Sequence, residues 1–367
     1  MVKILNIVTN GLKREGITTS LLEIIKNMDL DGIQMDIASV YECDYEIKEE
    51  FKNLGCRVIQ FPNRSNILKY IFFLVRQFKM ETYDVIHVHG SSAIMTIELL
   101  TAKMCGIKKR IAHSRNTKCI NKVIDQILRP IFYVSYTDAI ACGEEAGKWL
   151  FGNRKFDIFY NGKDLDRFKF NVQKRADIRS QRNLNDKYII GFVGNIKDQK
   201  NPVFLLDVIK ECCERDKEIY AIFLGDGEMY TQIQNRILNY HLKERILMLG
   251  RVKNVDEFLS AFDLLLLPSK YEGLPNVILE AQINGLCSLV SSQVTQECKI
   301  TNLVKFLPIN LGKELWVDTI INNRNHTINN RIQESKEACK EMRARGFDIK
   351  ESANLYRGLY LNKGIKK

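Results

Sequence analysis

The sequence predicts an α/β fold in two domains, each built around a parallel sheet that helices cover. Short runs of β-branched and aliphatic residues alternate with amphipathic stretches of helical length, which is the pattern of parallel strands joined through helices. This pattern starts afresh at Tyr188. At 367 residues the chain also exceeds what a single core usually supports. We therefore predict two α/β domains of similar size.

The first series of strands and helices accounts for a domain over residues 1–168. Its strands are expected near residues 4–9, 35–39, 57–61, 85–89, 110–113, 139–142 and 158–160, with helices such as 18–27 and 68–79 between them. The segment 164–186 is rich in charge and poor in β-branched residues, which favours a linker.

The second series accounts for a domain over residues 169–346. Its strands are expected near residues 189–193, 220–224, 246–249, 264–267, 288–291 and 304–307. Residues 347–361 have helical spacing, and we expect a final helix over 347–363. Its pattern does not indicate what it packs against, and we expect it to pack back on the first domain. Ligands of open α/β sheets bind beyond the carboxyl ends of the strands, so two facing domains would form a cleft.

Composition narrows the class of protein. The net charge of +11 and the pI near 9.0 indicate an anionic partner, which could be nucleic acid, an acidic membrane surface or a phosphorylated substrate. Nucleic acid is disfavoured because no helix-turn-helix, RNA-recognition motif or zinc finger is present. The ten cysteines show neither C-x-x-C nor zinc spacing, as expected for free thiols in the cytoplasm. No apolar run approaches the length of a membrane span, which predicts a soluble or peripheral protein.

The most informative motif is residues 268–280, where two carboxylates stand on either side of a predicted strand-to-helix junction. Pro275 suits the first position of a helix, so Glu272 is expected in the loop and Glu280 in the helix. Backbone N–H groups at a helix start favour phosphate, whereas carboxylates bind hydroxyls. The motif therefore fits a ligand that carries both sugar and phosphate, although acids near a helix start also occur for stability alone.

A second loop of the same kind covers residues 195–202. Asn201 is a favoured helix cap and Pro202 a favoured first helical residue, so Lys200 is expected just ahead of a helix N-terminus. Its ammonium adds positive charge to a site already suited to phosphate. Alone, the loop would describe a capped helix with a solvated lysine. Its strand and that of Glu272 are expected in one sheet, however, with both loops at the same edge.

These motifs resemble family 4 of the retaining glycosyltransferases, and most of all its bacterial exopolysaccharide and capsule enzymes. The resemblance covers nearly the whole chain, and the order and spacing of the motifs are highly specific. It is carried by Gly194 with Lys200 and Asn201, and by residues 225–228, 250–252, 272–280, 110–117 and 142–152. It implies the GT-B architecture, two facing Rossmann-like domains with a deep interdomain cleft, in which the first domain binds the acceptor and the second the donor.

The resemblance also implies roles for single residues. Lys200 matches the lysine that binds the donor diphosphate, Glu272 the glutamate beside the hydroxyls of the transferred sugar, and Glu280 the glutamate on ribose. In the first domain, Gly16 matches a glycine near the diphosphate and His113 a histidine near the transferred sugar. Glu272, His113 and Lys200 form the implied catalytic set. The other implied donor-binding positions are Gly194, Asn195, Arg251, Val252, Gly273, Leu274, Pro275 and Asn276.

One departure from the family pattern concerns the phosphate. Asn195 stands where the family usually has an arginine, which removes charge from a site that stabilises a departing diphosphate. Lys197 is one candidate for a compensating base. Arg115, which replaces a usual histidine, is the other, and Lys163 adds further charge where isoleucine is usual.

The resemblance implies a retaining, metal-independent hexosyltransferase. It would move a hexosyl or N-acetylhexosaminyl unit from a nucleotide sugar, expected to be a UDP-sugar, to a lipid-linked saccharide in exopolysaccharide or capsule biosynthesis. It implies no cofactor, and His87 with His89 are too few to indicate a metal. Because of Asn195, a catalytically impaired sugar-nucleotide-binding subunit remains the alternative. The carboxylate pair by itself would also fit a glycosidase.

Two features predict a peripheral position on the inner face of the cell membrane. Basic residues outnumber acids between Lys103 and Pro130, and an anionic leaflet attracts each by about 1 kcal/mol. The helix at 68–79 is rich in aromatic residues, so it either packs against the sheet or lies in the membrane interface.

Overall fold

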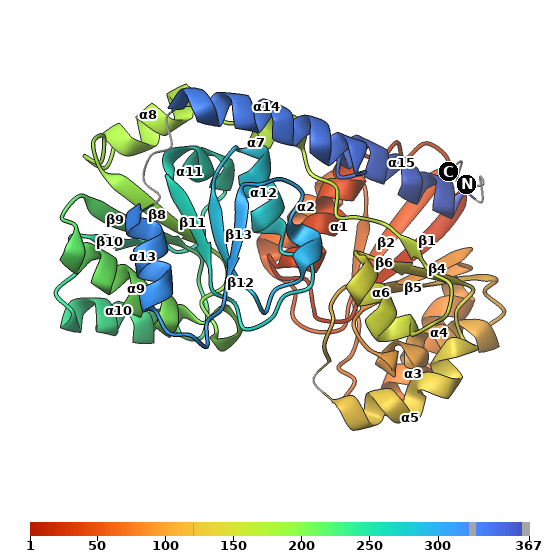
Figure 1. Ribbon diagram of the computed structural model, residues 1–367. Coiled ribbons are helices and arrows are strands. Elements are labelled where there is room, and N and C mark those ends of the chain that lie inside the picture. Colours follow the sequence, from red (N-terminus) through yellow and green to blue (C-terminus); the bar gives the residue numbers. More distant parts are fainter. Residues whose placement is uncertain (120, 323–327, 362–367) are drawn as a thin grey trace. The chain divides into compact units, whose positions relative to one another are not determined.

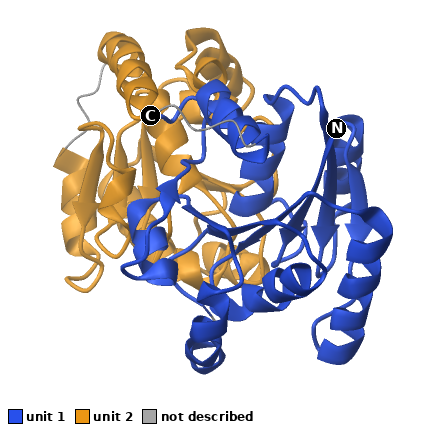
Figure 2. Cartoon of the chain, turned by 90° about the vertical axis from the view of Figure 1, so that its right-hand side faces the viewer, with its two compact units in different colours: residues 1–163, 346–367 blue, residues 164–345 orange. Residues whose placement is uncertain are grey.

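The computed structural model describes residues 1–119, 121–322 and 328–361 (Figure 1). The chain divides into two compact units, Met1–Lys163 with the segment from Gly346 onward, and Asp164–Arg345 (Figure 2). Each unit holds one parallel sheet between helices, which confirms the predicted α/β class.

The first unit contains a seven-stranded sheet in the order β3-β2-β1-β4-β5-β6-β7. Its strands are β1 (Val2–Val8), β2 (Ile33–Ser39), β3 (Arg57–Gln60), β4 (Val85–Gly90), β5 (Lys109–Ser114), β6 (Asp138–Ala141) and β7 (Asp157–Ile158). Its helices are α1 (Gly16–Lys26), α2 (Tyr45–Asn53), α3 (Ile67–Glu81), η1 (Ala93–Met95), α4 (Thr96–Met104), α5 (Lys122–Tyr133), α6 (Glu144–Phe151) and α15 (Ile349–Tyr360).

Helices cover both faces of this sheet, so its central strands β1, β4 and β5 are buried over most of their length. Alternate residues of a strand point to opposite faces. Ile4 and Val8 accordingly join a core with α1, α2 and α15, whereas Leu5 and Ile7 join a core with α3 and α4. The buried side of α3 lies in the second of these cores, as expected for a helix that covers the sheet.

The second unit contains a six-stranded sheet in the order β10-β9-β8-β11-β12-β13. Its strands are β8 (Tyr188–Val193), β9 (Ile219–Leu224), β10 (Ile246–Met248), β11 (Leu264–Leu267), β12 (Ser288–Ser291) and β13 (Val304–Leu307). Its helices are α7 (Leu165–Phe168), α8 (Val172–Ser180), η2 (Asp198–Lys200), α9 (Pro202–Arg215), α10 (Tyr230–Asn239), α11 (Val255–Ala261), α12 (Asn276–Ile283), η3 (Gln296–Cys298), α13 (Glu314–Asn322) and α14 (Ile328–Ala344).

The prediction of a linker at 164–186 was wrong, because this segment forms α7 and α8 and belongs to the second unit. Arg167 Nε lies 3.2 Å from Asp256 Oδ1, and Asn284 Nδ2 donates to the carbonyl of Phe168 at 2.9 Å. These contacts place α7 within the second unit. The division therefore falls after Lys163 and not after residue 168.

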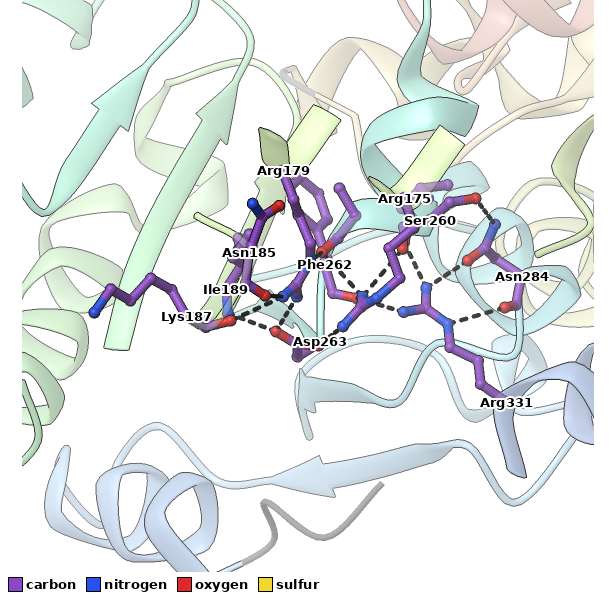
Figure 3. A network of polar contacts seen from close by, with 12 residues as sticks. Arg175, Arg179, Asn185, Lys187, Ile189, Ser260, Phe262, Asp263, Asn284 and Arg331 are labelled. Atoms are coloured by element: carbon purple, nitrogen blue, oxygen red, sulfur yellow. Dashed lines mark hydrogen bonds and ion pairs between the residues drawn. The ribbon is translucent and has the colours of Figure 1, made fainter. Parts of the chain in front are cut away.

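Two arginines of α8, Arg175 and Arg179, belong to a polar network inside the second unit, at the end of α11 (Figure 3). Arg175 Nη2 bonds Asp263 Oδ1 at 2.5 Å, and Arg179 Nε bonds the carbonyl of Ala261 at 2.9 Å. Arg331 of α14 bonds the carbonyl of Leu259 at 2.5 Å. Three guanidinium groups thus satisfy the carbonyl groups that the C-terminus of α11 leaves open, where the helix dipole favours positive charge.

The final helix α15 lies in the first unit. Lys109 Nζ donates to the carbonyl of Leu359 at 2.5 Å, and Lys163 exchanges backbone hydrogen bonds with Phe347 and Ile349. The last two positions of the helix expected at 347–363 lie outside the described residues.

Candidate active site

The topology of the second sheet marks a ligand position. Strands β9 and β10 lie on one side of β8, and β11, β12 and β13 lie on the other. The order of strands therefore switches between β8 and β11, and open α/β sheets bind ligands at the carboxyl ends of the strands that flank such a point. The loop after β8 carries Lys200, and the loop after β11 carries Glu272. Two residues that are distant in sequence meet there.

Lys200 and Glu272 form an ion pair in which Lys200 Nζ contacts Glu272 Oε1. Their side chains are only 14% and 11% exposed. Ser269 Oγ donates to the same carboxylate oxygen at 2.8 Å, and Gln199 Nε2 donates to the carbonyl of Tyr271 at 2.9 Å. Ser269 and Gln199 lie within the two motifs at 268–280 and 195–202, but the motifs assigned neither of them a role, and their roles follow only from the contact between the two loops.

A second ion pair joins the same loops. Lys270 Nζ lies 2.5 Å from Asp198 Oδ1, and the backbone N–H of Lys270 donates to the carbonyl of Gln199 at 2.8 Å. Side-chain and backbone bonds therefore fix the spacing of Lys200 and Glu272 before any ligand binds.

The two loops lead into helix N-termini close to the expected positions. Helix α9 begins at Pro202, as predicted, and α12 begins at Asn276, one residue after Pro275, which is the cap residue instead of the first helical one. Asn201 has a left-handed conformation with φ of 54°, and its side chain makes no capping hydrogen bond. Asn201 is therefore the cap residue, as predicted, but it contributes a left-handed turn and not a side-chain hydrogen bond.

Glycines bring the neighbouring loops into backbone contact. A Cβ atom on Gly225, where φ is 136°, would lie 2.0 Å from the carbonyl oxygen of Gly194. The N–H of Gly225 donates to the carbonyl of Gly250 at 2.7 Å. The loops after β8, β9 and β10 thus contact one another through their backbones at the carboxyl edge of the sheet.

The remaining predicted donor-binding residues of the second unit lie at this edge. Asn195 and Lys197 follow β8, and Arg251 with Val252 follows β10. Arg251 is exposed, with its Nε 4.0 Å from Asp226 Oδ2. Gly273, Leu274, Pro275 and Asn276 lead from Glu272 into α12.

Glu280 lies one turn beyond Asn276 on α12. These are the two positions among residues 276–283 that are not fully buried. A helix otherwise enclosed by the core therefore presents one polar edge, which carries the predicted ribose-binding carboxylate.

The first unit gathers buried polar groups near the centre of its sheet. His113 in β5 is fully buried, and its Nδ1 lies 3.1 Å from Nε2 of His87, whose Nδ1 lies 2.8 Å from Tyr360 Oη. His113 Nε2 has no hydrogen-bond partner. Burial, and after it the charge of Arg115, lowers the pKa of His113 well below 6.5. His113 is therefore a buried neutral imidazole with one ring nitrogen that lacks a hydrogen-bond partner.

Arg115 follows β5 and is also buried. Its Nη1 donates to Asn161 Oδ1 at 2.7 Å, and its Nη2 lies 3.0 Å from His89 Nδ1. In the part of the chain that the structure describes, no carboxylate lies within ion-pair distance of this guanidinium. A buried cation without an anionic partner is costly, which favours an anionic ligand nearby.

The three histidines do not favour a metal centre. His87, His89 and His113 have ring nitrogens within 4.8 Å of one another, and they are the one such group among the described residues. Both nitrogens of His89 are engaged, by Asn6 at 2.9 Å and by Arg115. A cation would have to displace these bonds beside the Arg115 charge. The geometry fits a neutral hydrogen-bonded cluster better.

A pocket of about 890 Å³ opens at the carboxyl edge of β1, β2 and β3. Its lining includes Asn10, Tyr41, Glu42, Asp44 and Asn63. Amide and carboxylate groups beside an aromatic ring suit the hydroxyls and the ring faces of a saccharide. No sequence motif marked this pocket, because its residues come from three separate loops. Gly16 lies at the start of α1, after the loop that leaves β1.

A second cavity of about 470 Å³ lies elsewhere. Tyr188, Asp263 and Cys287 line it, and these stand at the amino ends of β8, β11 and β12. It is therefore at the edge of the second sheet opposite to Lys200 and Glu272, and it is not at the ligand position that the topology marks.

Comparison with known proteins defines the class. Residues 173–302 match the family model described as glycosyl transferases group 1. The fold is similar to that of Anabaena Alr3699/HepE, crystallised in complex with UDP-glucose, with a TM-score of 0.81 at 17% identity over 99% of this chain and 100% of that one. The chain has the GT-B fold, with one Rossmann-like domain in each unit.

Curated relatives agree with this class. The chain is 28% identical over 329 residues to EpsF of Bacillus subtilis (strain 168), named provisionally as a glycosyltransferase, with 85% of each chain covered. It is 25% identical to the UDP-Gal:alpha-D-GlcNAc-diphosphoundecaprenol alpha-1,3-galactosyltransferase of Escherichia coli, over 82% of this chain and 81% of that one. It is 24% identical to the capsular polysaccharide biosynthesis glycosyltransferase CapH of Staphylococcus aureus, over 87% and 90%. The protein is a glycosyltransferase, similar to enzymes of capsule and polysaccharide biosynthesis.

Proposed function

We propose that this protein transfers a hexosyl or N-acetylhexosaminyl unit from a UDP-sugar to a saccharide acceptor with retention of configuration. The observation that carries the proposal is the Lys200–Glu272 pair at the switch point of the second sheet, between two helix N-termini. The relative crystallised with UDP-glucose and the relative named for UDP-Gal support a uridine diphosphate donor.

Each side of the pair would take one part of the donor. The ammonium of Lys200 and the N–H groups at the starts of α9 and α12 would bind the diphosphate, and the Glu272 carboxylate would accept hydroxyl groups of the sugar. Glu280 would accept a hydroxyl of ribose, and the backbone near Arg251 would contact the base. A bound donor would thus break the Lys200–Glu272 ion pair and contact both of these side chains.

In the proposed reaction, the bond between the anomeric carbon of the sugar and the diphosphate oxygen breaks while the acceptor hydroxyl attacks that carbon from the same face. The proton of the acceptor hydroxyl would pass to the departing diphosphate oxygen. Lys200 and the helix ends would stabilise the negative charge that develops on the leaving diphosphate. Glu272 would position the sugar and not form a covalent bond with it. His113 would hold a sugar hydroxyl through its open Nε2. This proposal assigns no step to a metal or cofactor.

The missing arginine at Asn195 is proposed to be offset by another base. The buried guanidinium of Arg115 has no carboxylate partner among the described residues, which makes it the stronger candidate, and Lys197 is the other. Calorimetric titration with UDP should then show weaker binding for Arg115→Ala and tighter binding for Asn195→Arg. Unchanged affinity in both variants would refute this assignment.

The acceptor is proposed to be a lipid-linked saccharide bound by the first unit. The pocket beside Tyr41 has the polar and aromatic lining that a saccharide needs, and one relative is named for a diphosphoundecaprenol acceptor. A lipid-linked acceptor would also place the enzyme at the inner face of the membrane.

A panel of nucleotide sugars tests the proposed reaction. We expect one UDP-sugar to release UDP when incubated with the full chain and a saccharide acceptor, and the product to keep the anomeric configuration of the donor by proton NMR. Glu272→Gln should lower the rate by about a hundredfold or more, in the range of lost transition-state contacts. An inverted product would contradict the retaining mechanism.

The alternative is a sugar-nucleotide-binding subunit without turnover, which the substitution at Asn195 favours. The same assay separates the two functions, since a UDP-sugar that raises the melting temperature without releasing UDP would support the binding subunit.

A further inference from the structure

Helix α5 presents a row of aliphatic side chains to solvent. Val123, Ile124, Ile127, Ile131 and Val134 are 66%, 44%, 68%, 43% and 59% exposed. Their spacing places them on one side of the helix, and Pro130 is exposed between them. We refer to these five aliphatic residues as the α5 row.

The opposite side of α5 holds the helix in the first unit. Phe132 is fully buried in the core, and Asp125 Oδ1 accepts a hydrogen bond from the N–H of Ala93 at 2.7 Å. A surface helix normally turns polar residues outward once its apolar side is buried. Helix α5 instead has apolar residues on both sides, so the outer row needs an explanation.

Apolar exposure continues onto the neighbouring helices. Helix α4 packs against both α3 and α5, and the three are gathered together in Figure 1. Lys103 Nζ donates to the carbonyl of Val134 at 2.8 Å, which places the exposed Met104 near the end of α5. Leu68 and Phe72 of α3 are also largely exposed. Aliphatic and aromatic side chains thus extend over three helices of the first unit.

The charge around these helices is one-sided. The acids of residues 67–134 are Glu81, Asp84, Glu98 and Asp125. Glu81 pairs with Lys3 and Arg57, Asp84 accepts from the backbone of Lys3, Glu98 is buried with Arg64, and Asp125 is buried with Arg129. The exposed lysines of the same segment are Lys69, Lys79, Lys103, Lys108, Lys118 and Lys122. This surface therefore favours an anionic partner.

We propose that the α5 row inserts into the interface of an anionic phospholipid bilayer, with the surrounding lysines on the lipid phosphates. An apolar row edged with lysine is the pattern of helices that lie in the membrane interface. A protein partner is less well matched, because the row offers no polar group to fix the register of an interface. None of the described helices is both long and apolar enough to cross a bilayer. The contact would thus lie in the plane of the interface.

The proposed docking gives the lipid-linked acceptor of the proposed function a physical route to the enzyme, and in that respect it rests on that function. Binding to vesicles itself requires neither donor nor acceptor. A lipid-free assay of UDP release and a vesicle assay can therefore fail independently of one another.

Vesicle flotation of the full chain tests the proposal. Wild-type protein should float with vesicles of phosphatidylcholine and phosphatidylglycerol and much less with phosphatidylcholine alone. The double variant Ile127→Asn with Ile131→Asn should bind at least about tenfold more weakly, because two aliphatic side chains are withdrawn from the bilayer. Lys108→Glu with Lys122→Glu should weaken binding only to the anionic vesicles.

A matched control separates insertion from general loss of surface hydrophobicity. Leu238 and Leu311 are exposed leucines of the second unit, and Leu238→Asn with Leu311→Asn should bind vesicles as the wild type does. All variants should keep the wild-type melting temperature with UDP, which shows that they are folded.

Tryptophan fluorescence gives a direct readout of insertion. Emission from Ile127→Trp, taken as the difference from wild type, should shift to shorter wavelength on anionic vesicles and be quenched by brominated lipid. Equal vesicle binding by wild type and by the Ile127→Asn, Ile131→Asn variant would overturn the proposal. So would a wild-type protein that ignores vesicles but forms a dimer in solution that the same variant abolishes.

Discussion

At the scale of single residues, the candidate site contains a charged group of little exposure in each unit: a paired one in the second unit and, in the first, one without a carboxylate partner in the part of the chain that the structure describes. In the second unit, Lys200 and Glu272 compensate one another and leave the site neutral until a ligand divides them. In the first unit, Arg115 is buried beside three neutral histidines and lacks a carboxylate partner among the described residues. A buried guanidinium without a carboxylate partner is costly for stability. Under the proposed function, both groups would contact a donor that carries phosphate and hydroxyl groups.

The histidine cluster predicts that stability falls in mild acid. Burial lowers the pKa of His87, His89 and His113 well below 6.5, so the folded chain holds them neutral while the unfolded chain protonates them near pH 6.5. Their contribution is therefore complete above pH 6.5 and is lost as the pH falls further. Each histidine should cost about 1.4 kcal/mol per pH unit below 6.5.

Thermal melts of wild type and of His89→Gln between pH 7.5 and 5 measure this effect. The variant removes one titrating group, so its melting temperature should depend less steeply on pH. An identical slope in both proteins would contradict a neutral, buried His89.

At the scale of elements, the network at the end of α11 predicts a large effect on stability at the edge of the sheet opposite to Lys200 and Glu272. Arg331→Met would remove the guanidinium donor of the buried Leu259 carbonyl and one donor of the Phe262 carbonyl, which Arg175 also contacts. This should cost about 2–4 kcal/mol of unfolding free energy. Lys336→Met, an exposed change on the same helix, should cost almost nothing. Urea denaturation compares the two, and equal midpoints would show that the network does not stabilise the second unit.

The strands were predictable from the sequence because their physics is local. Strands of a sheet covered on both faces are rich in apolar residues, and the runs at residues 189–193 and 264–267 carry that signal without reference to their neighbours. Helix starts at Pro202 and near Pro275 were predictable for the same reason, because proline fixes the local backbone.

Features that depend on contacts between residues far apart in the chain could not be predicted from the sequence. The many charges of residues 164–186 led to the prediction of a linker. Two of them, Arg175 and Arg179, are in fact paired with Asp263, which lies far along the chain. The two loops of the donor site were expected at one edge, but the ion pair of Lys200 with Glu272 follows only from the distance between them. The pocket beside Tyr41 and the α5 row likewise follow only from the folded surface.

At the scale of the whole molecule, the chain returns to its first unit after completing the second. Helix α15 buries Tyr356 and Tyr360 in the core of the first unit, and Tyr360 bonds His87. The first unit is therefore complete only when the last helix is present, even though its sheet is formed by the first part of the sequence.

Truncation after Arg345 tests this dependence. Loss of α15 should speed amide hydrogen exchange in β1, β4 and β5, because their core loses its cover, and should leave exchange in β8, β9 and β11 unchanged. Unchanged exchange in the first sheet, or faster exchange confined to the second, would contradict the division into units.

Calorimetric titration of wild type, Lys200→Met and Glu272→Gln with UDP and with the preferred UDP-sugar tests the central claim most directly. The claim is that Lys200 binds the donor diphosphate and Glu272 the sugar. Lys200→Met should therefore bind both ligands about tenfold or more weakly, the size of a lost charge-assisted hydrogen bond. Glu272→Gln should keep its affinity for UDP and lose the additional affinity for the UDP-sugar. Wild-type affinity for both ligands in Lys200→Met would contradict the account.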